Sequence, residues 1–223
     1  MRQEHLKNLL LKYRNLLKDR YYRWAVIIGI VALIASGLII SATKNYVNQA
    51  TGNPLGDVLL DNLPTFPMIN FLIWGIITIV VSIFIFALFH PEYFPALFKS
   101  FALLFFIRAV FISVTHIKSY PTKEIANIDY PRLVNFLYNG DDLFFSGHVA
   151  LPFLAMLIFW NYKWFRSYLL IAVLASAVAV ILAKSHYSID VLAAPFITYT
   201  IYHIAQHFFK KDFGYIRSFD ARD

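Results

Sequence analysis

Long uncharged apolar stretches alternate with short polar segments along this chain. Residues 24–43 and 68–89 are apolar runs that contain no charged side chain. Because an α-helix rises 1.5 Å per residue, runs of about 20 residues cross the roughly 30 Å of hydrocarbon in a bilayer. Both runs therefore predict transmembrane helices.

Four further apolar segments complete the pattern. Residues 95–117 are long enough to span but carry Lys99 and Arg108. Three segments that are shorter or contain histidines follow, namely residues 149–162, 167–183 and 191–209. The periodicity predicts an all-α fold, a polytopic membrane protein with six transmembrane helices and a single domain over residues 23–209.

The residues before the first span predict an amphipathic interfacial helix over residues 1–22. Lys and Arg alternate there with apolar side chains at helical spacing: Leu6, Leu9, Leu10, Tyr13, Leu16, Leu17 and Tyr21. Such a helix lies on anionic headgroups with its apolar face in the bilayer. The pattern favours equally a helix that packs on the protein's own cytoplasmic loops.

Charge predicts the orientation. The chain has 20 Lys and Arg, 13 Asp and Glu and a net charge of +7, and most of the basic residues fall on the side that holds both termini. Cytoplasmic loops carry an excess of Lys and Arg, so we expect cytoplasmic termini, with residues 210–223 as a cytoplasmic tail. The polar residues before the first span predict no cleaved signal peptide. No motif indicates nucleic-acid binding, and the absence of cysteine excludes disulfides and thiolate metal sites.

His186 and Asp190 are four residues apart at the start of the last span. On a helix they share one face, so the carboxylate can accept the imidazole N–H and leave the far nitrogen's lone pair free. A histidine oriented in this way is a candidate nucleophile or base. The alternative is a structural pair that anchors the helix end.

His148 follows Ser146 and Gly147 at the start of the fourth predicted span. The N-terminal turn of a helix presents unpaired N–H groups and a positive dipole end, which together form an anion site. Glycine allows a close approach of the backbone, so a phosphate would fit there. A Ser–Gly N-cap with a histidine that faces interfacial water is the alternative.

Two cations lie near the same outer mouth. A guanidinium inside a span costs several kcal/mol unless it faces a polar cavity or a partner. Arg108 is therefore a candidate clamp on phosphate oxygens, or else an ion-pair partner of Asp190 or Asp142. Lys184 is a second candidate phosphate ligand, or a side chain that snorkels from the end of its span.

Phosphoryl transfer needs in-line attack, neutralised equatorial oxygens and a proton for the leaving oxygen. The outer mouth supplies candidates for each part. We expect no metal and no cofactor, because cationic side chains and backbone amides can stabilise the charge. His203 and His207 have a two-ligand spacing, but no third ligand is near them in sequence, so they are interpreted as interfacial histidines.

At these residues the chain resembles the sphingomyelin synthase branch of the type 2 phosphatidic acid phosphatase superfamily of lipid phosphatases and phosphotransferases. "HYSIDVLAAPF" is similar to its histidine–tyrosine–Ser/Thr–x–aspartate motif and "DLFFSGH" to its aspartate–x3–Ser–Gly–His motif. "FFIRAVFISVT" resembles the segment with its arginine, and "NPLGDVLLDNLP" resembles its proline-rich outer loop that ends in aspartate. The likeness runs in order from about residue 53 to 200.

The resemblance implies His186 as nucleophile, Asp190 as its orienter and His148 as the acid or base at the other oxygen. Asp57, Asp142 and Tyr187 are further candidates for contacts with the headgroup or acceptor. The chain departs from the branch at Gly140 and Asp141, which replace cysteine and glycine, and at Gly56 and Val149, which replace proline and threonine.

A departure from the wider superfamily bears on the substrate. Monoester phosphatases of this type carry Ser–Arg five residues before the third-motif histidine, where this chain has Ala179 and Val180. Their first-motif Arg–Pro is also missing, since Arg108 is followed by Ala109. Fewer cations suit a phosphodiester with one negative charge better than a dianionic monoester.

The sequence thus predicts a membrane lipid enzyme with an extracytoplasmic site. It would cleave a phospholipid at the glycerol–phosphate bond through a phosphohistidine and pass the headgroup phosphate to a lipid alcohol or to water. Its partners would be the phospholipid, this acceptor and the bilayer, while the oligomeric state is open. The alternatives are a lipid monophosphatase acting on phosphatidic acid or an isoprenyl phosphate, a transporter or channel, and a membrane scaffold without activity.

Overall fold

The apolar runs of the sequence form long helices that lie along one axis. The computed structural model describes residues 2–49, 52–115, 117–124 and 144–220, and within these ranges every regular element is helical. Asp142, one of the predicted site residues, lies outside them. The elements are α1 (Arg2–Lys18), α2 (Arg20–Gln49), α3 (Val58–Asn62), α4 (Ile69–Phe89), η1 (Pro91–Tyr93), α5 (Phe94–Val114), α7 (Gly147–Ile158), α8 (Lys163–Leu182), α9 (Ser188–Phe208) and α10 (Lys210–Asp220).

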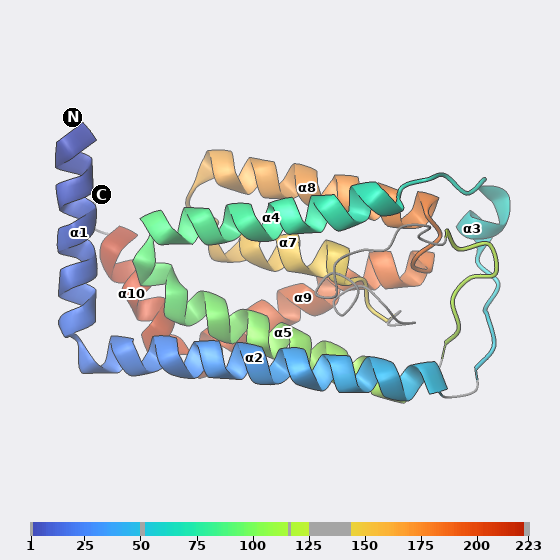
Figure 1. Cartoon of the computed structure of the whole chain (residues 1–223), viewed down its shortest axis with the longest axis horizontal. Coiled ribbons are helices and arrows are strands. Elements are labelled where there is room, and N and C mark those ends of the chain that lie inside the picture. Colours follow the sequence, from blue (N-terminus) through green and yellow to red (C-terminus); the bar gives the residue numbers. More distant parts are fainter. Residues whose placement is uncertain (1, 50–51, 116, 125–143, 221–223) are drawn as a thin grey trace.

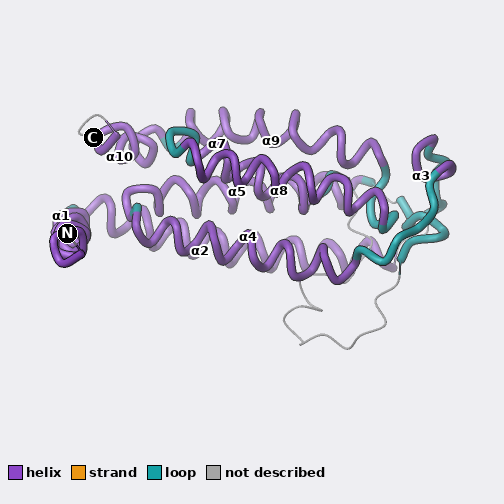
Figure 2. Tube along the Cα trace, turned by 90° about the horizontal axis from the view of Figure 1, so that it is seen from above, coloured by secondary structure: helices purple, strands orange, loops and turns teal. Residues whose placement is uncertain are grey.

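Helices α2, α4, α5, α7, α8 and α9 run lengthwise through the molecule and alternate in direction (Figure 1). Both termini lie at one end of this bundle, near α1 and α10, while α3 and the outer loops lie at the other. Helix α1 stands across the bundle axis, and the view from above shows it end-on (Figure 2). The ends of α7 and α9 that carry the predicted site lie on the side away from the termini.

Four helical segments of the described chain are long and apolar enough to cross a membrane. They are α2 with 30 residues, α4 with 21, η1 with α5 over Pro91–Val114 with 24, and α8 with 20. Helix α7 has only 12 residues, which is about 18 Å of rise and shorter than the hydrocarbon layer. Helix α9 has 21 residues but falls outside this group, because polar side chains such as Asp190, His203 and Gln206 interrupt it. The structure therefore supports four of the six predicted spans by length and composition.

The outer surface of the bundle is apolar. Exposed large hydrophobic side chains occur along α2, α4, α8 and α9 in the described chain, where a soluble protein would present polar groups. Trp24, Trp160 and Trp164 are all at least half exposed, and they lie near the start of α2, just after α7 and at the start of α8. Tryptophan concentrates at membrane–water interfaces. This surface indicates an integral membrane protein.

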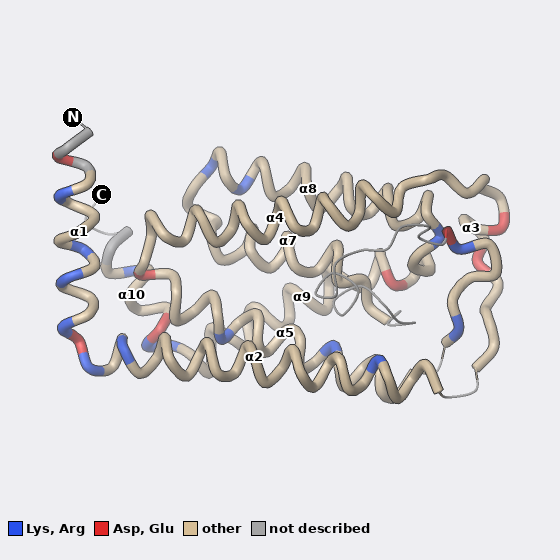
Figure 3. Tube along the Cα trace, viewed as in Figure 1, with Lys and Arg blue, Asp and Glu red and all other residues tan. Residues whose placement is uncertain are grey.

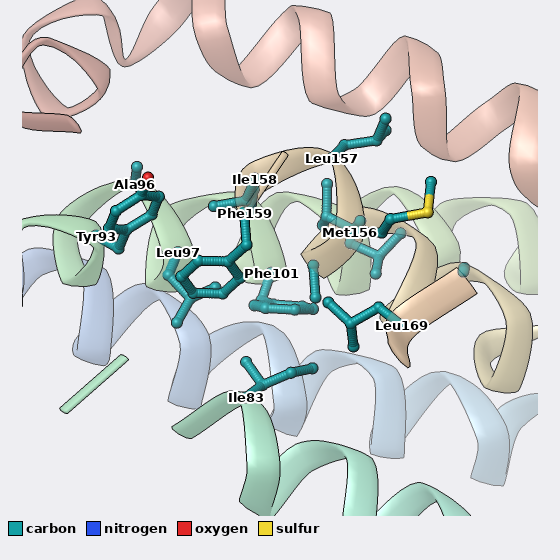
Figure 4. Close-up of a cluster of buried hydrophobic side chains, with 14 of the residues drawn as sticks. Ile83, Tyr93, Ala96, Leu97, Phe101, Met156, Leu157, Ile158, Phe159 and Leu169 are labelled. Carbon is teal, nitrogen blue, oxygen red and sulfur yellow. The ribbon is translucent and has the colours of Figure 1, made fainter. Parts of the chain in front are cut away.

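The largest core cluster fills the space between α4, α5, α7 and α8 (Figure 4). Its centre is aromatic, with Phe159 stacked on Tyr93 at a ring-centroid distance of 4.8 Å. Val149 and Phe145 extend the same cluster to the start of α7, and both are buried. The predicted site residues therefore stand on a packed interior.

Helix α1 contacts the end of the bundle through polar groups. Lys12 Nζ lies 2.7 Å from Glu92 Oε1, and the Tyr13 hydroxyl donates to the Leu88 carbonyl at 2.9 Å. These contacts agree with a helix that packs on the protein itself at this end of the bundle. Leu6, Leu10 and Leu17 nevertheless remain more than half exposed.

Helix also forms at two places outside the predicted spans. The first long helix begins at Arg20, because the Asp19 carboxylate accepts the Tyr21 N–H at 2.8 Å and caps it. The predicted tail forms helix α10, whose Phe213 joins the core. Figure 3 shows that Lys and Arg gather along α1 and at the end of the bundle that holds α10.

Candidate active site

His186 lies in the short turn between α8 and α9. Ser185 closes the turn from one side, since its N–H donates to the Val180 carbonyl at 3.0 Å. Helix α9 begins at Ser188, two residues after His186. Its start forms a capping box, in which the Asp190 carboxylate accepts the Tyr187 N–H at 3.0 Å. The backbone on both sides of His186 is therefore held by hydrogen bonds.

The predicted His–Asp pair forms. His186 Nδ1 lies 3.4 Å from Asp190 Oδ2, and the two side chains are 6% and 0% exposed. This distance is longer than a strong hydrogen bond, but contacts of catalytic residues often tighten only when substrate is bound. Asp190 faces Nδ1, so the arrangement directs Nε2 of His186 away from the carboxylate.

The start of α7 lies beside the start of α9. The Ser146 N–H donates to the Asp190 carbonyl at 3.2 Å, which joins the two segments directly. The imidazole rings of His148 and His186 are consequently neighbours, with centroids 6.3 Å apart and planes at 70°. The fold therefore brings these two histidines together.

Arg108 reaches this region from α5. It is only 7% exposed, and its Nε donates to the Phe145 carbonyl at 2.8 Å. Gly147 allows the guanidinium to approach the first turn of α7, because a Cβ at this position would lie 3.1 Å from Arg108 Cζ. The guanidinium therefore rests against the backbone of the Ser146–His148 segment.

The chemistry of these groups suits an anion. The N-terminal turn of α7 receives no side-chain cap from Ser146 and presents the positive end of a helix dipole, and Arg108 adds a full charge beside it. Ser146 Oγ is buried and has no hydrogen-bond partner among the residues that the structure describes. Two neighbouring imidazoles, an arginine and a helix N-terminus are groups that phosphoryl transfer can use.

Residues 140–208 match the family model described as PAP2 superfamily C-terminal. The match supports the type 2 phosphatidic acid phosphatase superfamily. With the apolar helices, it supports a membrane enzyme of the lipid phosphatase or phosphotransferase type. A comparison with curated proteins gave no match.

The superfamily match covers most of the predicted site but not Arg108 or Asp57. The fold brings His148, Arg108 and Gly147 to the His186–Asp190 pair. In the described chain, no group of three or more His, Asp or Glu gathers as a metal site would require.

Lys184 packs on the outer loops. Its backbone has a φ of 51°, an unusual conformation for a residue other than glycine, which reverses the chain after α8. Its Nζ lies 5.0 Å from the centre of the Tyr120 ring, and the side chain is only 6% exposed. The Lys184 ammonium group therefore makes a cation–π contact with Tyr120.

Two outer segments, residues 52–66 and 117–124, cover this end of the bundle, and we call them the outer cap. Tyr187 joins them, because its hydroxyl donates to the Lys118 carbonyl and accepts the Leu55 N–H, both at 2.9 Å. Glu124 caps α4 by accepting the Ile69 N–H at 2.9 Å. Tyr187 thus has a structural place in the cap, next to His186.

Asp57 makes a contact that sequence reasoning missed. Its Oδ2 accepts the N–H of Ser188 at 2.7 Å and the hydroxyl of the same residue at 2.8 Å. The two residues are 131 positions apart, and no local pattern connects them. The only signal in the sequence is that both occupy helix starts, where such side chains are common.

Proposed function

We propose that this protein is a membrane phosphotransferase or phospholipase C-type hydrolase that cleaves phospholipids at the glycerol–phosphate bond. The observation that carries the proposal is the neighbourhood of His148 and His186, with Asp190 behind one ring and Arg108 beside the first turn of α7. The proposal places the chain near the sphingomyelin synthase branch of its superfamily.

In the first step, His186 Nε2 attacks the phosphorus atom of the substrate. An N–P bond forms, the bond from phosphorus to the glycerol oxygen breaks, and His148 donates a proton to that oxygen, so diacylglycerol leaves. Asp190, 3.4 Å from Nδ1, stabilises the positive charge that develops on the His186 ring. The product on the protein is a phosphohistidine that carries the headgroup.

In the second step, His148 takes a proton from the acceptor, which is a lipid alcohol or water. The acceptor oxygen attacks phosphorus, the N–P bond breaks, and His186 returns to its neutral state. Arg108 and the amide groups at the start of α7 stabilise the equatorial oxygens in both steps.

A phosphodiester substrate agrees better with the site than a monoester. Ala179 and Val180 occupy the place of the Ser–Arg pair expected in the monoesterases, and both are buried apolar side chains. A phosphodiester carries one negative charge and a phosphomonoester carries nearly two at neutral pH. Arg108 and a helix N-terminus suffice for the smaller charge.

The proposed topology has six spans, with α7 and α9 completing the four apolar helices. Both termini face the cytoplasm, because the basic residues gather at that end, and the site faces the opposite side (Figure 3). Leu6, Leu10 and Leu17 of α1 are exposed on one side of a basic helix that lies across the bundle. Such a helix fits the cytoplasmic membrane surface.

The test offers purified protein three labelled lipids: phosphatidylcholine, phosphatidylethanolamine and phosphatidic acid. We expect diacylglycerol from at least one diester, and its loss by more than a thousandfold in His186→Ala, because the nucleophile is gone. His203→Ala is the matched control, since His203 is an exposed histidine on α9, the helix that follows His186. Adding ceramide, with mass spectrometry of all products, separates transfer from hydrolysis.

Three results would contradict the proposal. Phosphate release from phosphatidic acid alone would favour the monophosphatase. Diacylglycerol production that persists in His186→Ala would exclude the nucleophile. No turnover of any lipid, together with uptake of a solute into vesicles that hold the protein, would favour a transporter.

A further inference from the structure

One carboxylate, that of Asp57, caps two helices. Its Oδ1 accepts the N–H groups of Leu59 at 2.9 Å and Leu60 at 3.2 Å, which begin α3. Its Oδ2 accepts the N–H and the hydroxyl of Ser188, which begins α9. Four donors therefore converge on a side chain that is 7% exposed.

The charge of Asp57 suits this position. Desolvation raises the pKa of its carboxyl group, but the hydrogen bonds from Ser188, Leu60 and Leu59 outweigh desolvation, and the pKa lies below its ordinary value of 3.8. Asp57 is therefore an anion at neutral pH. An anion at a helix N-terminus is stabilised by the helix dipole and by the unpaired N–H groups.

Ser188 stands two residues after His186, so this cap reaches the proposed nucleophile. Asp190 holds the Tyr187 N–H from within α9, and Asp57 holds Ser188 from the outer cap. Tyr187, between them, is tied to the same outer segments through its hydroxyl. The outer cap therefore determines the backbone path that follows His186.

This geometry favours the capping role of Asp57 over a direct contact with the headgroup. Both oxygens already accept hydrogen bonds from helix N-termini, and a buried N–H that loses its acceptor costs about 1–3 kcal/mol. Recruiting Asp57 to a substrate would release Ser188 or the start of α3.

We infer that Asp57 is a positioning residue, which holds the His186 imidazole in line with the phosphorus atom through Ser188. This inference rests on the proposed function, because it assigns a role relative to the reaction of His186. It adds a structural link from the α2–α4 loop to the reacting nitrogen. Misplacement of a reacting group by about 1 Å costs on the order of a hundredfold in rate.

The experiment compares kcat, KM and the thermal midpoint of Asp57→Asn, Ser188→Ala and the double variant. Asparagine has one acceptor oxygen and would turn an N–H₂ group toward the second helix start. We expect kcat of Asp57→Asn to fall about tenfold to hundredfold with KM within twofold, because substrate contacts remain. The kcat of Ser188→Ala should fall several-fold, and the kcat of the double variant should be no lower than that of Asp57→Asn alone.

Two controls separate positioning from a merely structural role. Ser188→Thr keeps the hydroxyl and should restore the kcat that Ser188→Ala loses. Asp61→Asn removes a charge from α3. The Asp61 carboxylate accepts the Asp57 N–H rather than a donor of α9. The kcat of this variant should therefore stay within about threefold of wild type. The kcat of each variant is calculated per mole of folded protein, so a lower yield of folded protein alone does not lower kcat.

The outcomes distinguish this inference from the proposed function. A wild-type protein without lipid turnover would overturn the proposed function and the role that rests on it. An active wild type whose Asp57→Asn and Ser188→Ala variants keep normal kcat would overturn the positioning role alone. Additive losses in the double variant would also overturn it, because they would show that Asp57 does not act through Ser188. If Asp57→Asn does not fold, the Ser188→Ala and Ser188→Thr pair decides.

Discussion

Substituting Gly147 by alanine should reduce activity while the fold remains stable. A Cβ at residue 147 would lie 3.1 Å from Arg108 Cζ and 3.2 Å from one terminal guanidinium nitrogen. Ordinary contacts between heavy atoms are about 3.5–4.0 Å, so the guanidinium must move by roughly half an ångström. Residue 147 is therefore glycine because no room exists for a side chain. The neighbouring side chain is that of Arg108, the proposed phosphate clamp.

The expected loss follows from this displacement. Arg108 is held by its 2.8 Å hydrogen bond to the Phe145 carbonyl, so it cannot retreat without stretching that bond. A shift of about half an ångström at a charged clamp corresponds to roughly a tenfold loss in kcat/KM, which is about 1.4 kcal/mol of transition-state stabilisation. Alanine has a higher helix propensity than glycine, so the free energy of unfolding should hardly fall.

The assay is turnover of the preferred labelled phospholipid, together with the thermal midpoint in detergent. Gly37→Ala and Gly75→Ala are matched controls, because a Cβ at either position meets nothing within 4 Å. We expect both controls to keep wild-type kcat/KM. A Gly147→Ala variant that keeps kcat/KM within twofold of wild type would refute the reasoning.

Two further predictions concern stability. Gly29→Ala should lower the free energy of unfolding by about 1–3 kcal/mol, because the new Cβ would lie 2.9 Å from Phe98 Cβ and must push α2 away from α5. An unchanged thermal midpoint would contradict this packing. The depressed pKa of Asp57 predicts stability that is fully present above its ordinary pKa of 3.8 and is lost as pH falls through the lower folded-state pKa. The difference in thermal midpoint between wild type and Asp57→Asn should therefore be constant between pH 7 and pH 5 and shrink below pH 3.8. A difference that shrinks already near pH 6 would show that a group other than Asp57 titrates.

Much of the membrane architecture can be predicted from the sequence. The uncharged runs at residues 24–43 and 68–89 correspond to α2 and α4, since only a helix satisfies every backbone group in hydrocarbon. The fourth predicted span shows where this signal weakens. Helix α7 ends at Ile158 after 12 residues, because a helix packed inside a bundle is stabilised by its neighbours and need not match the bilayer thickness.

The identities of the site residues could also be proposed from local pattern. The four-residue spacing of His186 and Asp190 predicts a contact on one helix face, and the structure contains it at 3.4 Å. The glycine before His148 predicts a close backbone approach, and the structure places Arg108 against it. The geometry of the His–Asp pair is decided by a few neighbouring bonds, which sequence spacing can specify. The packing of α5 on α7 decides that Arg108 is the neighbour of Gly147.

The sequence by itself thus determined the apolar helices, the chemistry of the outer mouth and the local His–Asp pairing, because these depend on periodicity and on side-chain type. Only the tertiary structure decided which distant segments meet. The Asp57–Ser188 contact and the packing of Lys184 on Tyr120 join residues far apart in the chain. Such contacts depend on how whole helices pack, and many packings satisfy the same pattern of apolar and polar residues.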